Sequence, residues 1–183
     1  RLTVADYQPE SGAVYPDTEF GLGLQQTAQL IKADVGLEVS CIDLGGWDTH
    51  EGQGGAEGVM ASHLDELARG LLAFYTDLTE RMAGVTVVTM SEFGRTTAEN
   101  ASGGTDHGRA NAMFIMGGGA RSQVFARWPG LQPDALDEGD LAVTLDYREV
   151  LAEIVAGRLL NPALERVFPD YSAQLPGLIA ARS

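Results

Sequence analysis

The sequence predicts an α/β fold in which helices sandwich a mostly parallel sheet. Segments with helical periodicity alternate with short apolar runs, which is the order of parallel α/β units. Glycine-rich loops follow the apolar runs, and the composition, with 44% hydrophobic and 21% charged residues, is typical of a folded globular chain. The length of 183 residues predicts a single domain over residues 1–183.

The first half of the chain is expected to begin with an irregular approach segment over residues 1–19, which contain prolines, glycine and serine. Apolar residues then recur at helical spacing from Phe20 to about Asp34, which predicts a helix. Leu37–Leu44 is short, apolar and bounded by glycines, so it is predicted to be a strand. Its Cys41 is expected to be a buried core residue, and a lone cysteine leaves no internal disulfide.

The longest helix is predicted from Val59 to about Met82, where apolar residues recur at steps of four and three. Val85–Met90 and Ala112–Met116 are predicted strands, the first rich in β-branched residues. A helix over 146–160 and a shorter one after Pro162 complete the elements. The apolar face of the long helix is predicted at Met60, Leu64, Leu67, Leu71, Tyr75, Leu78 and Met82.

The charge balance restricts the partners of this chain. Twelve basic and 26 acidic residues give a net charge of -14, which repels nucleic acids and anionic membrane surfaces. No run approaches the ~18 apolar residues of a membrane span. A small phosphate or sulfate ester is also repelled unless a metal ion or a placed arginine offsets the charge.

Acidic residues and histidines gather in three loops that follow predicted strands or lie between them. These loops read GGWDTH at 45–50, SEFGRT at 91–96 and GTDHG at 104–108. In open α/β sheets, ligands bind at the loops that leave the carboxyl ends of the strands. Carboxylate oxygen and imidazole nitrogen are ligands for Zn²⁺ and Mn²⁺, so the loops predict a divalent-metal site. The candidate ligands are Asp48, His50, Glu92, Asp106 and His107.

Each loop also has a simpler explanation. Asp48 and His50 are two residues apart, so in an extended loop both side chains can point to one side, but they could instead cap the following helix. The segment 106–107 could be an ordinary turn. Glu92 ends a buried strand, where a carboxylate needs a cation or hydrogen bonds, and a salt bridge with Arg95 would also meet that need. His63 is expected to be a solvated or packing residue.

Taken together, the three motifs in this order resemble a bacterial family of the alkaline-phosphatase-like superfamily. Its members are often labelled sulfatase-like and commonly carry a twin-arginine export signal. The resemblance covers roughly residues 15–170 and implies a mostly parallel sheet between helices. It also implies two metal ions in the site and a periplasmic or extracellular location.

The resemblance also implies roles for individual residues. Asp48 and His50 match the first ligand pair, Glu92 matches an aspartate of an Asp-His pair, and His107 matches the late histidine ligand. Asp106 is either a ligand or the acceptor that orients an imidazole. Phe93 stands where that pair would have its histidine. The nucleophile and the first metal-binding aspartate of the superfamily belong to an N-terminal half, so this chain is expected to correspond to the metal-binding C-terminal part.

Two functions are therefore expected from the sequence. The first is a metal-dependent hydrolase of phosphate or sulfate esters, or its metal-binding half, in which Arg95 neutralises the oxyanion. Zn or Mn is the expected ion, with Ca or Mg as the alternative. The second is a non-catalytic module of an exported protein that retains metal or holds loops together. A nucleotide-binding domain is excluded because no phosphate loop follows a strand. Three strands are few for a sheet, which predicts a homodimer or association with the missing half.

Overall fold

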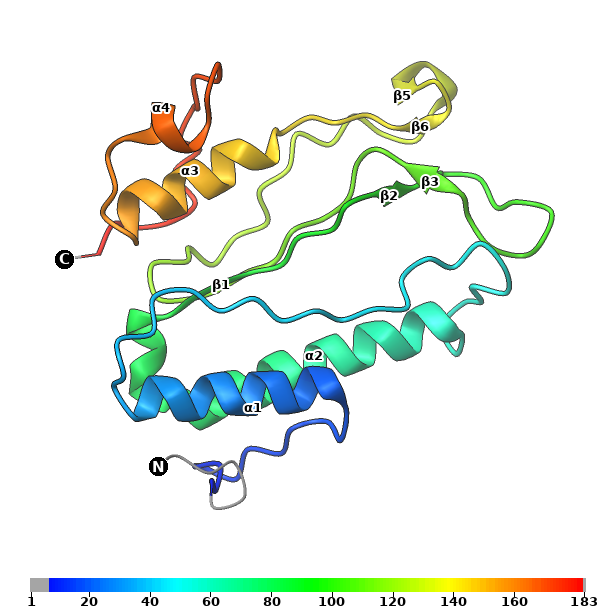
Figure 1. Cartoon of the computed structure of the whole chain (residues 1–183). Coiled ribbons are helices and arrows are strands. Elements are labelled where there is room, and N and C mark those ends of the chain that lie inside the picture. Colours follow the sequence, from blue (N-terminus) through cyan, green and yellow to red (C-terminus); the bar gives the residue numbers. More distant parts are fainter. Residues whose placement is uncertain (1–6, 183) are drawn as a thin grey trace. The chain divides into compact units, whose positions relative to one another are not determined.

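The computed structural model describes residues 7–182. These residues form helices and short strands, which confirms the mixed helix and strand content (Figure 1). The chain divides into two compact units. Unit 1 comprises the residues up to Met82 together with Asn100–Gly104, and unit 2 comprises Ala83–Glu99 and the residues from Thr105 onward. The single domain over 1–183 stays a prediction, and each unit is described by itself.

Unit 1 begins with an irregular segment, as predicted; residues 1–6 of that prediction lie outside the described residues. Helix α1 (Glu19–Lys32) starts at Thr18, whose hydroxyl accepts a hydrogen bond from the Gly21 amide at 3.2 Å. That bond satisfies one of the amides that a helix start leaves without a partner. Helix α2 (Val59–Leu78) continues into the 3₁₀ helix η2 (Thr79–Gly84), so the predicted long helix is confirmed within a few residues.

Helices α1 and α2 lie side by side in unit 1 (Figure 1). The close approach depends on Gly70 of α2, because a side chain there would overlap the Phe20 ring and meet Leu24. Gly70 is buried against these two residues, together with Ala73 and Phe74. Large apolar residues of α1 therefore pack against small residues of α2.

The buried face of α2 differs from the predicted one. Leu78 and Met82 are buried as expected, but Leu64 and Tyr75 are 45% and 51% exposed. The reason is that α2 packs on α1 through its small residues, which lie beside the predicted leucine stripe and not on it. A hydrophobic period locates an apolar face, but it does not decide which of two such faces a neighbouring helix covers.

The predicted strand Leu37–Leu44 is extended but belongs to no ladder among the described residues. It lies along α1, where the hydroxyls of Thr27 and Ser40 are 3.0 Å apart and Ile42 packs over Gly23. Cys41 is exposed, so the expectation of a buried cysteine is wrong. All residues from 37 to 41 are exposed, because this segment has no strand neighbours among the described residues to cover its side chains.

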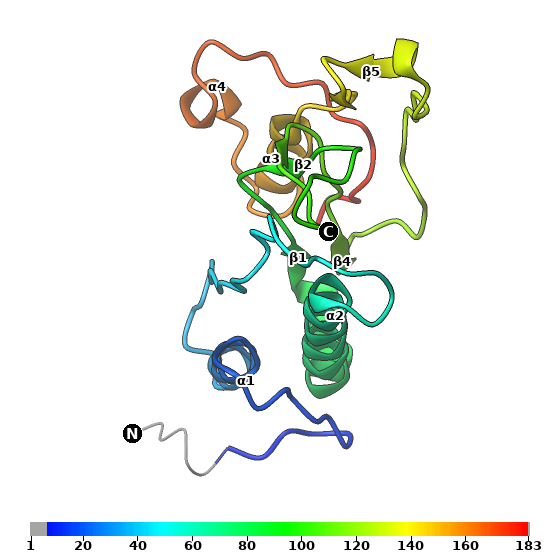
Figure 2. The ribbon, with the colours of Figure 1, turned by 90° about the vertical axis from the view of Figure 1, so that its right-hand side faces the viewer.

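Unit 2 contains the paired strands, and every pair in the described chain is antiparallel. The mostly parallel sheet is therefore not found there. The chain passes from β1 to β4 through loops and the β2–β3 pair, without the crossover helix that a parallel pair requires. Figure 2 shows β1 and β4 beside each other. The strands are β1 (Thr86–Val88) with β4 (Ile115–Gly117), β2 (Gly94–Arg95) with β3 (His107–Gly108), and β5 (Leu136–Asp137) with β6 (Asp140–Leu141).

The remaining elements of unit 2 are the 3₁₀ helix η3 (Pro133–Ala135) and two helices near the predicted positions, α3 (Tyr147–Gly157) and α4 (Leu164–Val167). Its hydrophobic core joins α3 to the C-terminal segment through three residues. These are Val150, Leu178 and Ile179. Among residues 7–182, no helix combines the length and apolar character that crossing a membrane would require.

Buried Glu153 of α3 holds the C-terminal segment, and its replacement by glutamine should destabilise unit 2. Its carboxylate accepts backbone hydrogen bonds from Gly177 and Leu178 at 3.1 Å and from Ile179 at 3.0 Å. An amide NH₂ would face at least one of these N–H donors, so Glu153→Gln should cost about 1.5–3 kcal/mol in urea unfolding. The exposed Glu165→Gln is the control. Equal stability of the two variants would show that the Glu153 carboxylate does not hold the C-terminal segment in place.

Candidate metal centre

The loop that carries Asp48 and His50 lies in unit 1, between the extended segment and α2. Gly46 adopts a φ of +90°, a conformation that favours glycine, and the His63 ring lies directly over it. The Trp47 indole donates to the Leu44 carbonyl at 2.7 Å, and its ring centroid lies 5.5 Å from that of His63. His63 is thus a packing residue, as expected, and it packs against the loop of the candidate ligands.

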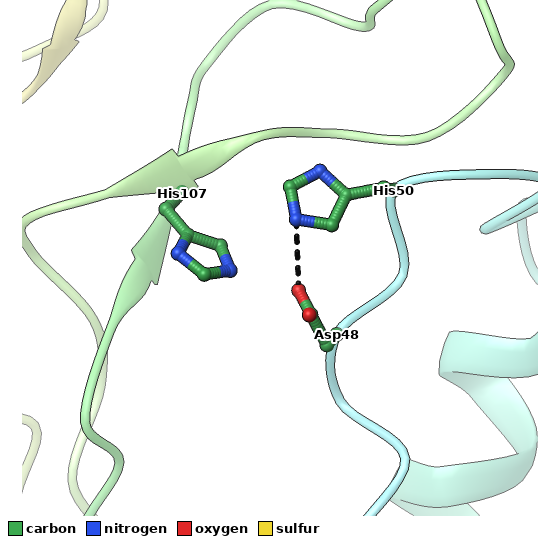
Figure 3. A group of neighbouring side chains, drawn as sticks. All are labelled: Asp48, His50 and His107. Atoms are coloured by element: carbon green, nitrogen blue, oxygen red, sulfur yellow. Dashed lines mark ion pairs between the residues drawn. The ribbon is translucent and has the colours of Figure 1, made fainter.

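Asp48 and His50 point toward each other. His50 Nε2 lies 3.0 Å from Asp48 Oδ1, and the two side chains are 42% and 58% exposed respectively (Figure 3). Between them, Thr49 is buried and its hydroxyl donates to the Gln53 side-chain oxygen at 2.9 Å. Because Thr49 faces inward, its two neighbours face outward on one side. The structure confirms the predicted convergence of this pair.

The chemistry of this pair suits a divalent cation. A tetrahedral Zn²⁺ with bonds of about 2.1 Å holds its ligand atoms about 3.4 Å apart. The observed 3.0 Å between Nε2 and Oδ1 would therefore have to open by about 0.4 Å, which half-exposed side chains can do. Metal binding through Nε2 would require the neutral imidazole tautomer that carries its proton on Nδ1.

His107 lies in unit 2, in the short β2–β3 pair. It is the cross-strand partner of Arg95, so both side chains stand on the same face of the pair. The Phe93 ring stacks on the imidazole, with centroids 4.1 Å apart and planes within 9°. Phe93 therefore covers one face of His107, at the position where the resemblance places a histidine.

The Arg95 guanidinium is fixed in the same part of unit 2. Its Nη1 donates to the Thr105 carbonyl at 2.7 Å, and its central carbon lies 4.9 Å from the centroid of the Phe93 ring. A cation over an aromatic face is stabilised by the ring's electron density. Arg95, Phe93 and His107 thus form one cluster of a cation, an aromatic ring and an imidazole.

Glu92 and Asp106 are less well supported as metal ligands, because both are exposed. Glu92 is exposed, so the argument that its carboxylate needs a cation to offset burial is wrong. The strand before it ends at Val88, four residues earlier, and the chain at Glu92 is already in a solvated loop. Asp106 is exposed as well, and its backbone is held by Thr96, whose amide donates to the Asp106 carbonyl at 3.0 Å.

Three described side chains each carry a donor of a kind that divalent metal ions accept, namely Asp48, His50 and His107. Figure 3 draws all three and marks the Asp48–His50 ion pair. The first two belong to unit 1 and the third to unit 2. The structure thus brings Asp48 to His50, and separately brings Arg95 to His107. Sequence reasoning did not find the residues that support the ligands, such as Thr49, Asn100 and Phe93.

Unit 2 also contains a wide, open cavity of about 1220 Å³. Aromatic side chains such as Phe114 and Trp128 line it, and so do Arg121, Arg127 and Glu92. In a chain with a net charge of -14, a cavity lined by three guanidinium groups, those of Arg109, Arg121 and Arg127, and two carboxylates, those of Glu92 and Asp146, is a local exception. The combination suits an anion that carries an apolar organic group.

Comparison with known proteins gives one match. A family model described as "Protein of unknown function (DUF1501)" matches residues 23–154, a range that contains all three motifs. No curated protein matches the chain. No solved structure matches it either.

Proposed function

The chain belongs to the DUF1501 family, and we propose that it is a metal-dependent hydrolase of phosphate or sulfate esters, or the metal-binding half of one. The observation that carries the proposal is the Asp48–His50 pair. A carboxylate and an imidazole meet at 3.0 Å on the exposed side of a loop, and the buried Thr49 side chain between them is hydrogen bonded to Gln53. Such a pair provides two ligands that need little rearrangement to take up a cation.

His107 is the proposed third ligand, and chain connectivity supports it. Segment 100–104 is hydrogen bonded to the loop that follows His50, for example through the Gly52 amide and the Ser102 carbonyl at 3.0 Å. His107 follows Gly104 by three residues, which can span no more than about 11 Å. The covalent chain therefore keeps this histidine within reach of the pair. Glu92 and Asp106 remain lower-ranked candidate ligands.

A divalent ion held by these residues would supply Lewis acidity and lower the pKa of water, with Zn²⁺ or Mn²⁺ the best match to mixed O and N ligands. Arg95 is the proposed oxyanion partner, because a planar guanidinium can donate two parallel hydrogen bonds to a phosphoryl or sulfuryl group. The stacked Phe93 ring and the Thr105 carbonyl restrict its orientation. The cavity with Arg121 and Arg127 supports an ester whose organic group is apolar.

Zn²⁺ or Mn²⁺ should raise the melting temperature of the metal-free protein. A free metal concentration of 100 times Kd stabilises by about 2.7 kcal/mol, which corresponds to about 5–10 °C for a chain of this size. The double variant His50→Ala/His107→Ala should lose this shift, whereas Asp65→Ala, which removes an exposed carboxylate from α2, should keep it. If wild type and the double variant respond alike, the metal centre is wrong.

The single variants then assign the ligands. His50→Ala should weaken metal binding because it breaks the observed pair, and His107→Ala should weaken it to a similar degree if this histidine completes the set. If the His107→Ala protein bound metal with wild-type affinity, the ligands would all belong to unit 1.

A non-catalytic role is the second candidate, favoured by the extent to which the ligand loop is tied by hydrogen bonds. In this role the metal would only stabilise the loops. Turnover of aryl phosphates or aryl sulfates by the metal-loaded protein distinguishes the two, since a structural site gives metal binding without turnover.

A further inference from the structure

We infer that Asn100 is a positioning residue for His50, an inference that rests on the proposed metal centre. The Asn100 side-chain nitrogen donates to the His50 backbone carbonyl at 2.9 Å, across fifty positions of sequence. Both residues belong to unit 1. The contact fixes the main chain of a proposed ligand, so the imidazole starts from a defined position.

The other end of the same side chain organises a turn. Asn100 Oδ1 accepts hydrogen bonds from the Ser102 amide at 2.9 Å and from the Gly104 amide at 3.1 Å. The Asn100 amide in turn donates to the Gly104 carbonyl at 2.8 Å. The side-chain amide offers, on two separate atoms, an acceptor for the turn and a donor for His50. Aspartate could replace the first function but not the second.

Two backbone hydrogen bonds extend the contact. The Gly52 amide donates to the Ser102 carbonyl at 3.0 Å, and the Gln53 amide donates to the Gly103 carbonyl at 2.9 Å. We call residues 100–104 the clasp, since they hold the chain at three points: at His50 itself and at Gly52 and Gln53 after it. Loops that carry metal ligands bind better when their supporting hydrogen bonds are already formed, because less ordering is needed on binding.

The clasp also has a consequence for modification. Asn100-Ala101-Ser102 has the pattern of an N-glycosylation acceptor. The nitrogen to which a glycan would be attached is the one that donates to His50. Glycosylation would replace one of the two hydrogens on this nitrogen, so the bond to His50 would then depend on the one that remains.

Asn100→Asp tests the inference in the full chain. The substitution keeps the acceptor for the turn, removes the donor to His50, and adds a negative charge that by itself would favour a cation. The positioning role predicts the opposite of that charge effect, namely a 10- to 100-fold loss of Zn²⁺ affinity in calorimetry. The visible bands of added Co²⁺, which report ligand geometry, should shift as well.

Hydrogen exchange in the metal-free protein complements the affinity measurement. Hydrogen exchange of the Gly52 and Gln53 amides should accelerate in Asn100→Asp, because the clasp that protects them loosens. The control is Asn161→Asp, which keeps the acceptor function of Asn161 toward the Ala163 amide in unit 2. Asn100→Ser, which also retains a short acceptor for the turn, is the second variant if the aspartate variant does not fold.

The outcomes separate the two proposals. Wild-type protein that binds no Zn²⁺ overturns the proposed metal centre, and the exchange rates then show only whether the clasp holds the loop. Zn²⁺ binding by wild type with unchanged affinity in Asn100→Asp overturns the positioning role of Asn100 alone. Faster exchange with unchanged affinity also overturns it, since the clasp would then stabilise the loop without affecting the ligand.

Discussion

Replacing Asp77 with alanine is expected to destabilise the protein by about 3–5 kcal/mol, the largest effect that the structure predicts for a single side chain. Asp77 lies near the end of α2 and is fully buried. Removing Asp77 leaves the Lys32 ammonium with only the half-exposed Glu10 carboxylate, 3.1 Å away, as an ion-pair partner, and the loss of a buried partner is costlier than the net strength of the pair. The measurement is urea unfolding followed by circular dichroism.

The contacts of Asp77 explain the size of the effect. Oδ1 accepts from the Lys32 ammonium and from the Glu10 amide, both at 2.6 Å. Oδ2 accepts from the hydroxyls of Tyr7 at 2.6 Å and Tyr15 at 2.7 Å. This one carboxylate therefore joins the irregular N-terminal segment to both helices of unit 1. Alanine would leave the Tyr7 and Tyr15 hydroxyls without this acceptor and the Lys32 ammonium with only the Glu10 carboxylate at 3.1 Å.

The control is Asp65→Ala, on the same helix. Asp65 is exposed and pairs with Arg69 at 3.4 Å, so its loss should change stability by less than about 1 kcal/mol. Adding Lys32→Met to the Asp77→Ala protein should cost little more or restore stability, because it removes a mostly buried ammonium that has lost its buried carboxylate and retains only the half-exposed Glu10. Strictly additive losses would show that Lys32 and Asp77 act independently.

The same cluster gives a pH dependence with a defined sign. Burial alone would raise the pKa of Asp77, but hydrogen bonds from Lys32, Tyr7 and two further donors outweigh it and hold the pKa below 3.8. A lowered folded-state pKa stabilises above the unfolded pKa, so this contribution is lost as pH falls below about 4. Burial and Asp77 raise the pKa of Tyr7 from 10.0 to about 12. That contribution is lost as pH rises from 10.0 to about 12. In the Asp77→Ala protein, the free energy of unfolding should therefore depend less on pH, both below about 4 and between 10.0 and about 12.

Sequence patterns predicted the helices of this fold better than its strands. The α2 pattern runs over many turns, so its period is unambiguous and its bounds agree within a few residues. Leu37–Leu44 has strand composition, yet it lies along α1 without a ladder. Composition reports that a segment suits an extended conformation, whereas pairing depends on a neighbour that a local pattern does not specify. The direction of the pairs, antiparallel here, is equally non-local.

The candidate site shows the same division. Asp48 and His50 could be paired from their spacing alone, because alternation along an extended chain puts both on one side. Glu92 was placed at a buried strand end, but the strand is shorter than predicted and the residue is exposed. Asp77 and Asn100 could not be found, because each acts through partners about fifty or more positions away. Nothing local distinguishes them from ordinary surface residues.

Replacing Gly104 with alanine should destabilise unit 1 and weaken metal binding at the same time. A methyl group on Gly104 would lie less than 3.0 Å from the backbone carbonyl atoms of His50 and Thr49. Backbone cannot move aside as a flexible side-chain end can, so the clasp or the ligand loop must shift. Overpacking of this kind costs about 1–3 kcal/mol, and contact with backbone predicts the upper part of that range. Urea unfolding measures the loss.

Gly45→Ala provides the matched control, since Gly45 precedes the same loop and a methyl group there would meet nothing within 4 Å. It should leave both stability and Zn²⁺ affinity near wild type. Gly104→Ala should lower the affinity about tenfold or more, in line with displaced support for a ligand. A stable Gly104→Ala protein with wild-type affinity would contradict the close approach of the clasp to His50. An unstable protein with wild-type affinity would show that the clasp matters for folding but not for the ligand.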